Sequence, residues 1–280
     1  MTPSPPVVTD GLQSPEHDDR AVSAVETVSA VGTVSAEETA VPADPGSARW
    51  WAERSLADRR RRPRAGGLST ERIVETSLEV LREEGLDAMT VRSVAERLGT
   101  SNASLYRHIA SRDELIALIA DHVMGDIRLK RTGRGWRADV EALMLEMRRV
   151  ILSQPLPPSA GRSQSGSGPN MLRLVEFALT LFREAGLTDR QAVYTTITMI
   201  EFVGGSASIR RSPAGRGSNG VAGAAGAAGL RQLLDGLPAD DFPALRAAGN
   251  LYTTASADDV FTHGMALFLD GVTSQLPGSH

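Results

Sequence analysis

Apolar residues recur at helical spacing through much of the chain, beginning near residue 70. The first such stretch has Ser69 or Thr70 as its N-cap and Gly85 as its end. Its inward face is expected to consist of Ile73, Val74, Ser77, Leu78 and Leu81. Spacings of three and four residues are typical of an amphipathic helix that packs on a core.

Residues 90–108 have the pattern of two short helices separated by a glycine. Thr90 caps the first helix, and Gly99 closes it because glycine adopts the left-handed conformation without steric cost. The first helix buries the apolar positions Val91, Val94, Ala95 and Leu98, and the second buries Leu105 and Ile109. A short helix with small hydrogen-bonding side chains at its start fits a DNA major groove. The pattern therefore predicts a helix-turn-helix and indicates a DNA-binding regulator.

A third element follows the helix-turn-helix. Ser111 and Glu114 have the S-x-x-E spacing of a capping box, directly before an apolar run at 115–119. This predicts a linking helix over 113–127, so that residues 67–127 form the DNA-binding domain with its linking helix.

The remainder, residues 128–280, is predicted to be a larger helical domain. Its apolar periodicity favours helices at 137–153, 170–185, 189–209 and 257–275, and its glycine- and serine-rich stretches at 159–168 and 212–229 are predicted loops. No stretch has the alternation of a strand. The expected fold is all-α, with a three-helix DNA-binding domain followed by a larger helical domain.

The beginning of the chain differs in composition from the rest. Residues 1–46 contain eight acidic residues, one arginine and no aromatic side chain, and are predicted to be a disordered tail, either without a role or with an interaction role. The whole chain carries a net charge of −4.

Residues 47–66 are predicted to be a basic arm that contains a run of arginines before the first helix. Positive charge concentrated in this way suits phosphate binding.

Several classes of protein are disfavoured by composition. There is no cysteine, which excludes disulfides and thiolate metal sites. The sequence shows neither a secretory signal nor an apolar run long enough to span a membrane, so we expect a cytoplasmic protein. The five histidines have no activating context, so we expect no catalytic site, no enzyme, no metal and no cofactor.

The motifs of the DNA-binding region resemble the TetR family of bacterial transcriptional regulators. The resemblance is carried by Glu-Glu-Gly-Leu-Asp-Ala-Met-Thr-Val-Arg (83–92), Ala-Glu-Arg-Leu-Gly-Thr (95–100), Ser-Leu-Tyr-Arg-His (104–108) and Ser-Arg-Asp-Glu-Leu (111–115). A weaker likeness to tetracycline-repressor-like C-terminal domains lies at 178–186 and 268–271. The family resemblance implies a homodimer that binds a double-stranded DNA operator and leaves it when a small molecule binds. It also implies that residues 128–280 form the ligand-binding and dimerisation domain.

The resemblance also implies which side chains contact DNA. Base edges would be read by Arg92, Asn102, Ser104 and Arg107, and phosphates would be bound by Tyr106 and His108. Supporting contacts would come from Thr90, Thr100, Ser101 and Arg112, and from the arm residues Arg60, Arg61, Arg62 and Arg64. The alternatives are that Tyr106 and His108 only pack the domain and that Arg107 is a solvated surface residue.

An effector pocket is expected between helices of the second domain. Its candidate residues are His122, Met144, Met147, Met171, Phe177 and Tyr194, each of which is alternatively ordinary core. A mostly apolar effector is expected, because methionines adapt to apolar shapes. Tetracycline is not the expected effector, since no histidine between His122 and His263 matches the metal-chelating histidines of the family's type member.

The long helices at 189–209 and 257–275 carry more apolar residues than one small domain needs. These residues are Val193, Ile197, Ile200, Phe261, Met265 and Phe268, and by family analogy they form a dimer interface. Two further alternatives remain open. The protein is either a repressor or an activator, and its second domain is either a ligand sensor or only a dimerisation or protein-interaction module that acts without a ligand.

Overall fold

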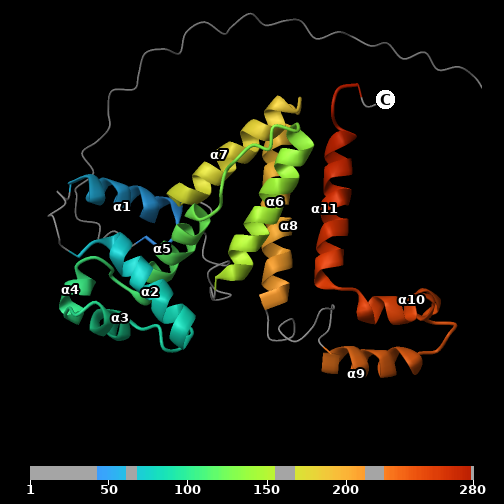
Figure 1. Cartoon of the computed structure of the whole chain (residues 1–280), viewed down its shortest axis with the longest axis horizontal. Coiled ribbons are helices and arrows are strands. Elements are labelled where there is room, and N and C mark those ends of the chain that lie inside the picture. The colour runs from blue at the N-terminus through green and yellow to red at the C-terminus, as the bar shows by residue number, and fades with distance from the viewer. Residues whose placement is uncertain (1–42, 61–67, 155–167, 212–223, 279–280) are drawn as a thin grey trace, which may run out of the picture. The chain divides into compact units, whose positions relative to one another are not determined.

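A computed structural model describes residues 43–60, 68–154, 168–211 and 224–278 of the 280 (Figure 1). These residues form helices joined by turns, with no strand among them, which confirms the predicted all-α class. The predicted tail at 1–46 lies almost entirely outside the described residues. None of the described helices is both long enough and apolar enough to span a membrane.

The DNA-binding region consists of α2 (Thr70–Glu84), α3 (Val91–Arg97), α4 (Asn102–Tyr106) and α5 (Arg112–Gly125). Their ends follow the predicted caps. The Ser69 hydroxyl accepts from the backbone N–H of Arg72 at 3.2 Å, and Gly85 and Gly99 have φ angles of 85° and 64°. The predicted inward residues of α2 are all buried, which places the first helix face correctly.

The N-terminal end of α5 differs from the predicted capping box. The Ser111 hydroxyl caps the helix by accepting from the N–H of Glu114 at 3.1 Å. The Glu114 carboxylate, however, accepts from the N–H of Ala110 and pairs with Arg54. The reciprocal half of the box is lost because a buried arginine competes for the carboxylate.

The prediction of a basic arm at 47–66 is wrong in its first part, because these residues form the helix α1 (Ala48–Arg60). Its sequence is rich in alanine and arginine, which favour helix, and Trp51 gives it a buried anchor with 9% of its surface exposed. The ring of Trp50 packs edge-on against Trp51, with centroids 4.6 Å apart. The arginines at 61, 62 and 64 lie outside the described residues, as does the side chain of Arg60.

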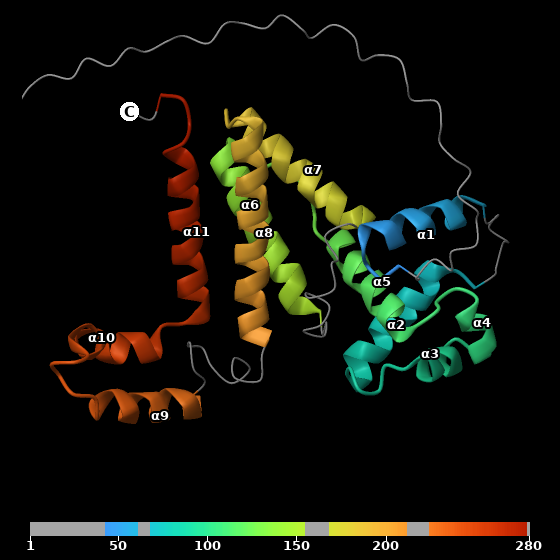
Figure 2. The same cartoon turned by 180° about the vertical axis from the view of Figure 1, so that it is seen from behind.

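The second domain contains α6 (Trp136–Ser153), α7 (Pro169–Glu184), α8 (Asp189–Arg211) and α11 (Ala257–Thr273), close to the four predicted helices. Helix α5 contacts α2 on one side and α6 and α7 on the other, so it joins the two regions, as Figures 1 and 2 show. One continuous core runs from Ile73 through Leu115 to Phe182.

Two helices were not predicted, α9 (Ala224–Asp235) and α10 (Pro243–Thr254). They pack against each other (Figure 2). The start of α9 falls within the predicted loop at 212–229. Gly226 and Gly229 disfavour helix, which is why a loop was predicted, whereas the alanines between them favour helix. Gly249 interrupts α10 with a φ of 38°.

Candidate nucleic-acid interface

The helix α4 presents one apolar and one polar face. Leu105 is fully buried and holds the helix on the domain, while Asn102, Tyr106 and Arg107 are exposed and Ser104 and His108 are half-buried. The Ser101 hydroxyl caps the helix through the N–H of Ser104 at 3.2 Å. This burial of one leucine directs the remaining side chains outward, so the polar face of α4 is available for contact.

The side chains on this face have defined partners. The Arg107 guanidinium donates to the Ser104 hydroxyl at 3.0 Å, which places two of the predicted base-reading residues next to each other. On α3, Arg92 is exposed and its Nε lies 2.8 Å from the Glu96 carboxylate. An exposed ion pair of this kind contributes little to stability, so Arg92 can exchange its partner for a base at low cost.

Other predicted contact residues are engaged in building the domain. Thr90 and Ser93 form a reciprocal capping box at the start of α3, which gives the Thr90 hydroxyl a structural role. Arg112 donates to the backbone carbonyls of Leu86 and Met89 at 3.1 and 3.3 Å, so it ties the α2–α3 connection to α5. Ser101 acts as the α4 cap, and Thr100 is half-buried at the preceding turn.

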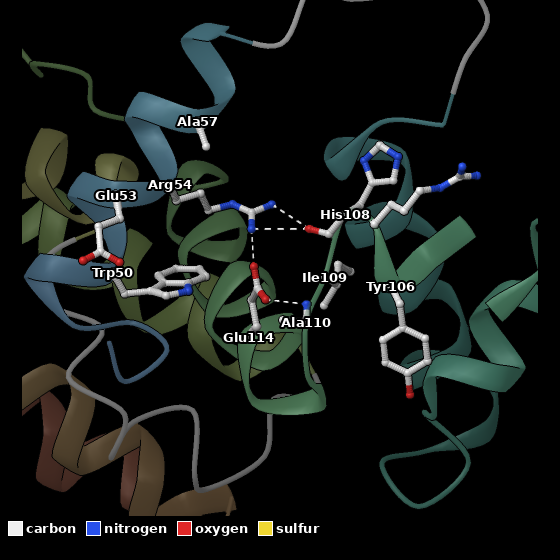
Figure 3. Close-up of a pocket in the computed structure, with 10 residues that line it drawn as sticks. Trp50, Glu53, Arg54, Ala57, Tyr106, His108, Ile109, Ala110 and Glu114 are labelled. Atoms are coloured by element: carbon white, nitrogen blue, oxygen red, sulfur yellow. Dashed lines mark hydrogen bonds and ion pairs between the residues drawn. The ribbon is translucent and has the colours of Figure 1, made fainter. Parts of the chain in front are cut away.

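A junction beside this interface was not anticipated from the sequence. Arg54 of α1 and Glu114 of α5 form a buried ion pair, with 11% and 9% of their side chains exposed. A hollow of about 300 Å³ lies next to the pair, between α1 and the end of α4, and its wall includes Trp50, Tyr106 and His108 (Figure 3). The two tryptophans before the arginine run could have indicated that this segment packs on the domain, since solvated arms rarely contain tryptophan.

A second unanticipated contact joins the linking helix to the second domain. The Asp121 carboxylate of α5 accepts from the backbone N–H groups of Asn170 and Met171, both at 3.1 Å, and so caps α7 from another helix. The Asn170 side chain donates to the Asp121 carbonyl at 3.1 Å. Burial raises the pKa of Asp121 above its ordinary value, although these hydrogen bonds oppose the shift.

The candidate effector residues do not share one environment. Met144 and Met147 are fully buried in the core, whereas Met171, Phe177 and His122 are half-buried. Tyr194 is 63% exposed, so its predicted place between facing helices is wrong in the isolated chain. The buried stripe of α8 contains Ala192, Thr196 and Met199, which leaves Tyr194 on the opposite side of the helix.

Two sequence-family models match the chain. The one described as bacterial regulatory proteins, tetR family, matches residues 73–119, and the one described as tetracyclin repressor-like, C-terminal domain, matches residues 129–276, which is more than half of the chain. The chain belongs to the TetR family. This confirms the resemblance deduced from the motifs, and the TetR family consists of transcriptional regulators rather than enzymes.

Named relatives agree with this assignment. A relative from Streptomyces coeruleorubidus, the HTH-type transcriptional repressor DrrR1, is 34% identical over 157 residues, which cover 54% of this chain and 58% of DrrR1. An HTH-type transcriptional regulator from Saccharopolyspora erythraea is 32% identical over 142 residues, covering 50% of this chain and 60% of the relative. The matched regions thus span less than two thirds of these relatives.

A solved structure matches more of the chain. The Streptomyces coelicolor TetR family protein ActR, in complex with actinorhodin, is 31% identical, covers 77% of this chain and all of its own, and superposes with a TM-score of 0.67. The match to the tetR family description begins at residue 73, after the end of α1 at Arg60. Helix α1 therefore lies outside the matched part of the DNA-binding domain.

Proposed function

We propose that this TetR-family chain is a cytoplasmic repressor that binds a palindromic DNA operator as a homodimer and leaves it when a small, mostly apolar effector binds. The observation that supports the proposal is the polar face of α4. Asn102, Ser104 and Arg107 lie on this face, and buried Leu105 anchors the helix to the domain from the other side. A short helix of this kind places its first residues against base edges in the major groove.

The roles proposed for the individual side chains follow from their chemistry. Arg107 suits a guanine, whose O6 and N7 accept two hydrogen bonds from a guanidinium, and this pairing is worth about 1–3 kcal/mol of base discrimination. Asn102, Ser104 and Arg92 read neighbouring base edges, and Tyr106 and His108 bind phosphates. Thr90, Thr100, Ser101 and Arg112 act mainly by holding the helices. The arginines at 60–64 add sequence-independent attraction to phosphates or to the minor groove.

Dimerisation is supported by apolar side chains that the single chain leaves in solvent. Val193, Tyr194 and Ile197 are exposed on α8, and Val260 and Leu267 are exposed on α11. Phe261 and Met265, which were also expected at the interface, instead pack inside the chain with 2% and 4% of their surface exposed. The proposed interface therefore uses the exposed face of α11, which includes Val260 and Leu267, rather than the buried face with Phe261 and Met265.

Effector response is supported by the solved complex of ActR with actinorhodin and by the link between the domains. Helix α7 is held to α5 through Asp121, and α5 belongs to the DNA-binding domain. An effector that favours a different position of α7 would shift α5, and with it the separation of the two reading helices. Met171 and Phe177 of α7 and His122 of α5 are candidate effector residues on these two helices, and all three are half-buried.

The proposal is tested by mobility shift with the DNA that flanks this protein's own gene. We expect a discrete complex that fades as actinorhodin or a mostly apolar, ring-containing compound is added, while tetracycline has no effect. A complex that forms but resists a broad library of such compounds contradicts the effector part of the proposal. A library screen by thermal shift separates the ligand-independent alternative, because a bound effector raises the melting temperature by mass action.

A further inference from the structure

We propose that Arg54, on the helix that precedes the matched TetR domain, is a positioning residue for DNA reading. Through Glu114 it fixes the turn that follows α4 and thereby sets how Tyr106, Arg107 and His108 face the DNA. This inference rests on the proposed DNA-binding function.

Arg54 lies where α1 meets α2 and α5. Its guanidinium pairs with Glu114 of α5 and donates to the Thr70 hydroxyl, the first residue of α2, at 3.0 Å. Its Cζ atom lies 5.4 Å from the centre of the Trp50 ring, which adds a cation–π contact. One buried side chain of α1 therefore contacts the beginnings of two helices of the DNA-binding domain.

Arg54 and Glu114 both contact the turn between α4 and α5. The Arg54 guanidinium donates to the His108 carbonyl through both terminal nitrogens, at 3.4 and 3.5 Å, and the Glu114 carboxylate accepts from the Ala110 N–H at 2.5 Å. Figure 3 shows these contacts converging on the stretch from His108 to Ala110. The ion pair thus holds one acceptor and one donor of the turn, on either side of buried Ile109.

The residues proposed to contact DNA lie in this turn or directly before it. Arg107 and His108 belong to the same turn, and Tyr106 is the last residue of α4. A two-bond contact between a guanidinium and a guanine tolerates only small errors of position, so a turn with more freedom reads bases less selectively. Plain stabilisation of the domain by α1 would change the melting temperature but not the selectivity of the folded protein.

The experiment compares four full-length proteins on two DNA duplexes. The duplexes are one that the wild-type protein selects from a random-sequence library and a scrambled duplex of equal composition. The variants are Arg54→Met, which keeps the aliphatic stem but removes the charge, Arg54→Lys, which keeps the charge, and the control Arg49→Met. Arg49 lies on the same helix and pairs with Glu53 at 2.7 Å, but both side chains are more than half exposed. Binding is measured by fluorescence anisotropy, well below each melting temperature.

We expect Arg54→Met to lower the ratio of selected to scrambled affinity about tenfold, which is within the discrimination that one guanidinium–guanine contact provides. Arg54→Lys should fall in between, because one ammonium cannot reach Glu114, Thr70 and His108 together. Arg49→Met should keep the ratio within about twofold, as exposed pairs contribute little. An unchanged ratio in folded Arg54→Met overturns the inference.

A further variant keeps the test decisive if Arg54→Met does not fold. Arg54→Met combined with Glu114→Gln leaves no unpaired buried charge and retains an oxygen for the Ala110 N–H, so it should fold and still lose selectivity. An unchanged ratio in this double variant also overturns the inference. If the wild-type protein itself enriches no sequence from the library, the proposed function fails instead, and the two failures are thereby distinguished.

Discussion

Replacing Asp121 should weaken the tie between the DNA-binding region and the second domain by a predictable amount. Its carboxylate is the acceptor for the first N–H groups of α7, and Asp121 is buried with 4% of its surface exposed. In Asp121→Ala two backbone donors lose their acceptor at a site that water reaches poorly. The loss of a helix cap costs about 1–2 kcal/mol, and buried unsatisfied donors raise this, so we expect about 2 kcal/mol.

The Asp121→Asn variant separates the charge of this side chain from its hydrogen bonds. Burial raises the pKa of Asp121, so the folded state holds its proton more tightly than the unfolded chain and the charged form is the unfavourable one. The contribution of Asp121 to stability is therefore largest at low pH and decreases as the pH rises through the folded pKa. An asparagine keeps one acceptor oxygen without the charge, so at neutral pH it should lose less than about 1 kcal/mol.

Thermal and urea denaturation of the full-length protein measure these differences. A loss of about 2 kcal/mol corresponds to a decrease in Tm of about 4–8 °C for a protein of this size. The control is Asp126→Ala at the end of α5. Asp126 is exposed, and its carboxylate accepts from the Gln154 side chain at 3.5 Å. Equal losses for Asp121→Ala and Asp126→Ala would refute the reasoning, as would a larger loss for Asp121→Asn than for Asp121→Ala.

The remaining predictions concern space, charge and the tail. Gly168→Ala should lower the Tm, because a Cβ there would lie 2.1 Å from the Asp121 carboxylate, and this loss should shrink in the Asp121→Ala background. Glu146→Gln should destabilise the protein at neutral pH and progressively less below about pH 4, because Arg149 and Arg128 hold the pKa of Glu146 well below its usual range. Urea denaturation at neutral pH and below about pH 4 measures the two losses, and a loss of stability that does not depend on pH argues against this. Removal of residues 1–46, which carry a net charge of −7, should leave the Tm unchanged and tighten DNA binding at low salt only, and tightening that persists in high salt would exclude an electrostatic cause.

The sequence predicted the helix-turn-helix in detail because its signals are local. A cap, a glycine stop and an apolar face each depend on residues three or four positions apart, and Ser69, Gly85 and Leu105 behave as their positions indicate. The same locality explains why α1 was missed in part. Its burial depends on Trp51 and on the contact between Arg54 and Glu114, which are 60 residues apart in the chain.

The candidate effector site was less predictable for a related reason. Apolar periodicity gives the buried face of a helix but does not say whether that face meets the chain's own core, a ligand or a second copy. Phe261 and Met265 on α11 were assigned to a dimer interface and lie in the core, while Tyr194 was assigned to a pocket and lies in solvent. Long helices with apolar residues on two faces leave this choice to tertiary packing.

The central claim is that α4 reads DNA sequence, and selection from a random-sequence duplex library tests it most directly. The wild-type protein should enrich two inverted half-sites whose centres are about one helical turn or more apart. Arg107→Ala should enrich the same arrangement with the preference lost at one base pair in each half-site, whereas Arg92→Ala should alter a different position. Enrichment of no sequence by the wild-type protein, or identical base preferences for wild type and Arg107→Ala, would contradict the account.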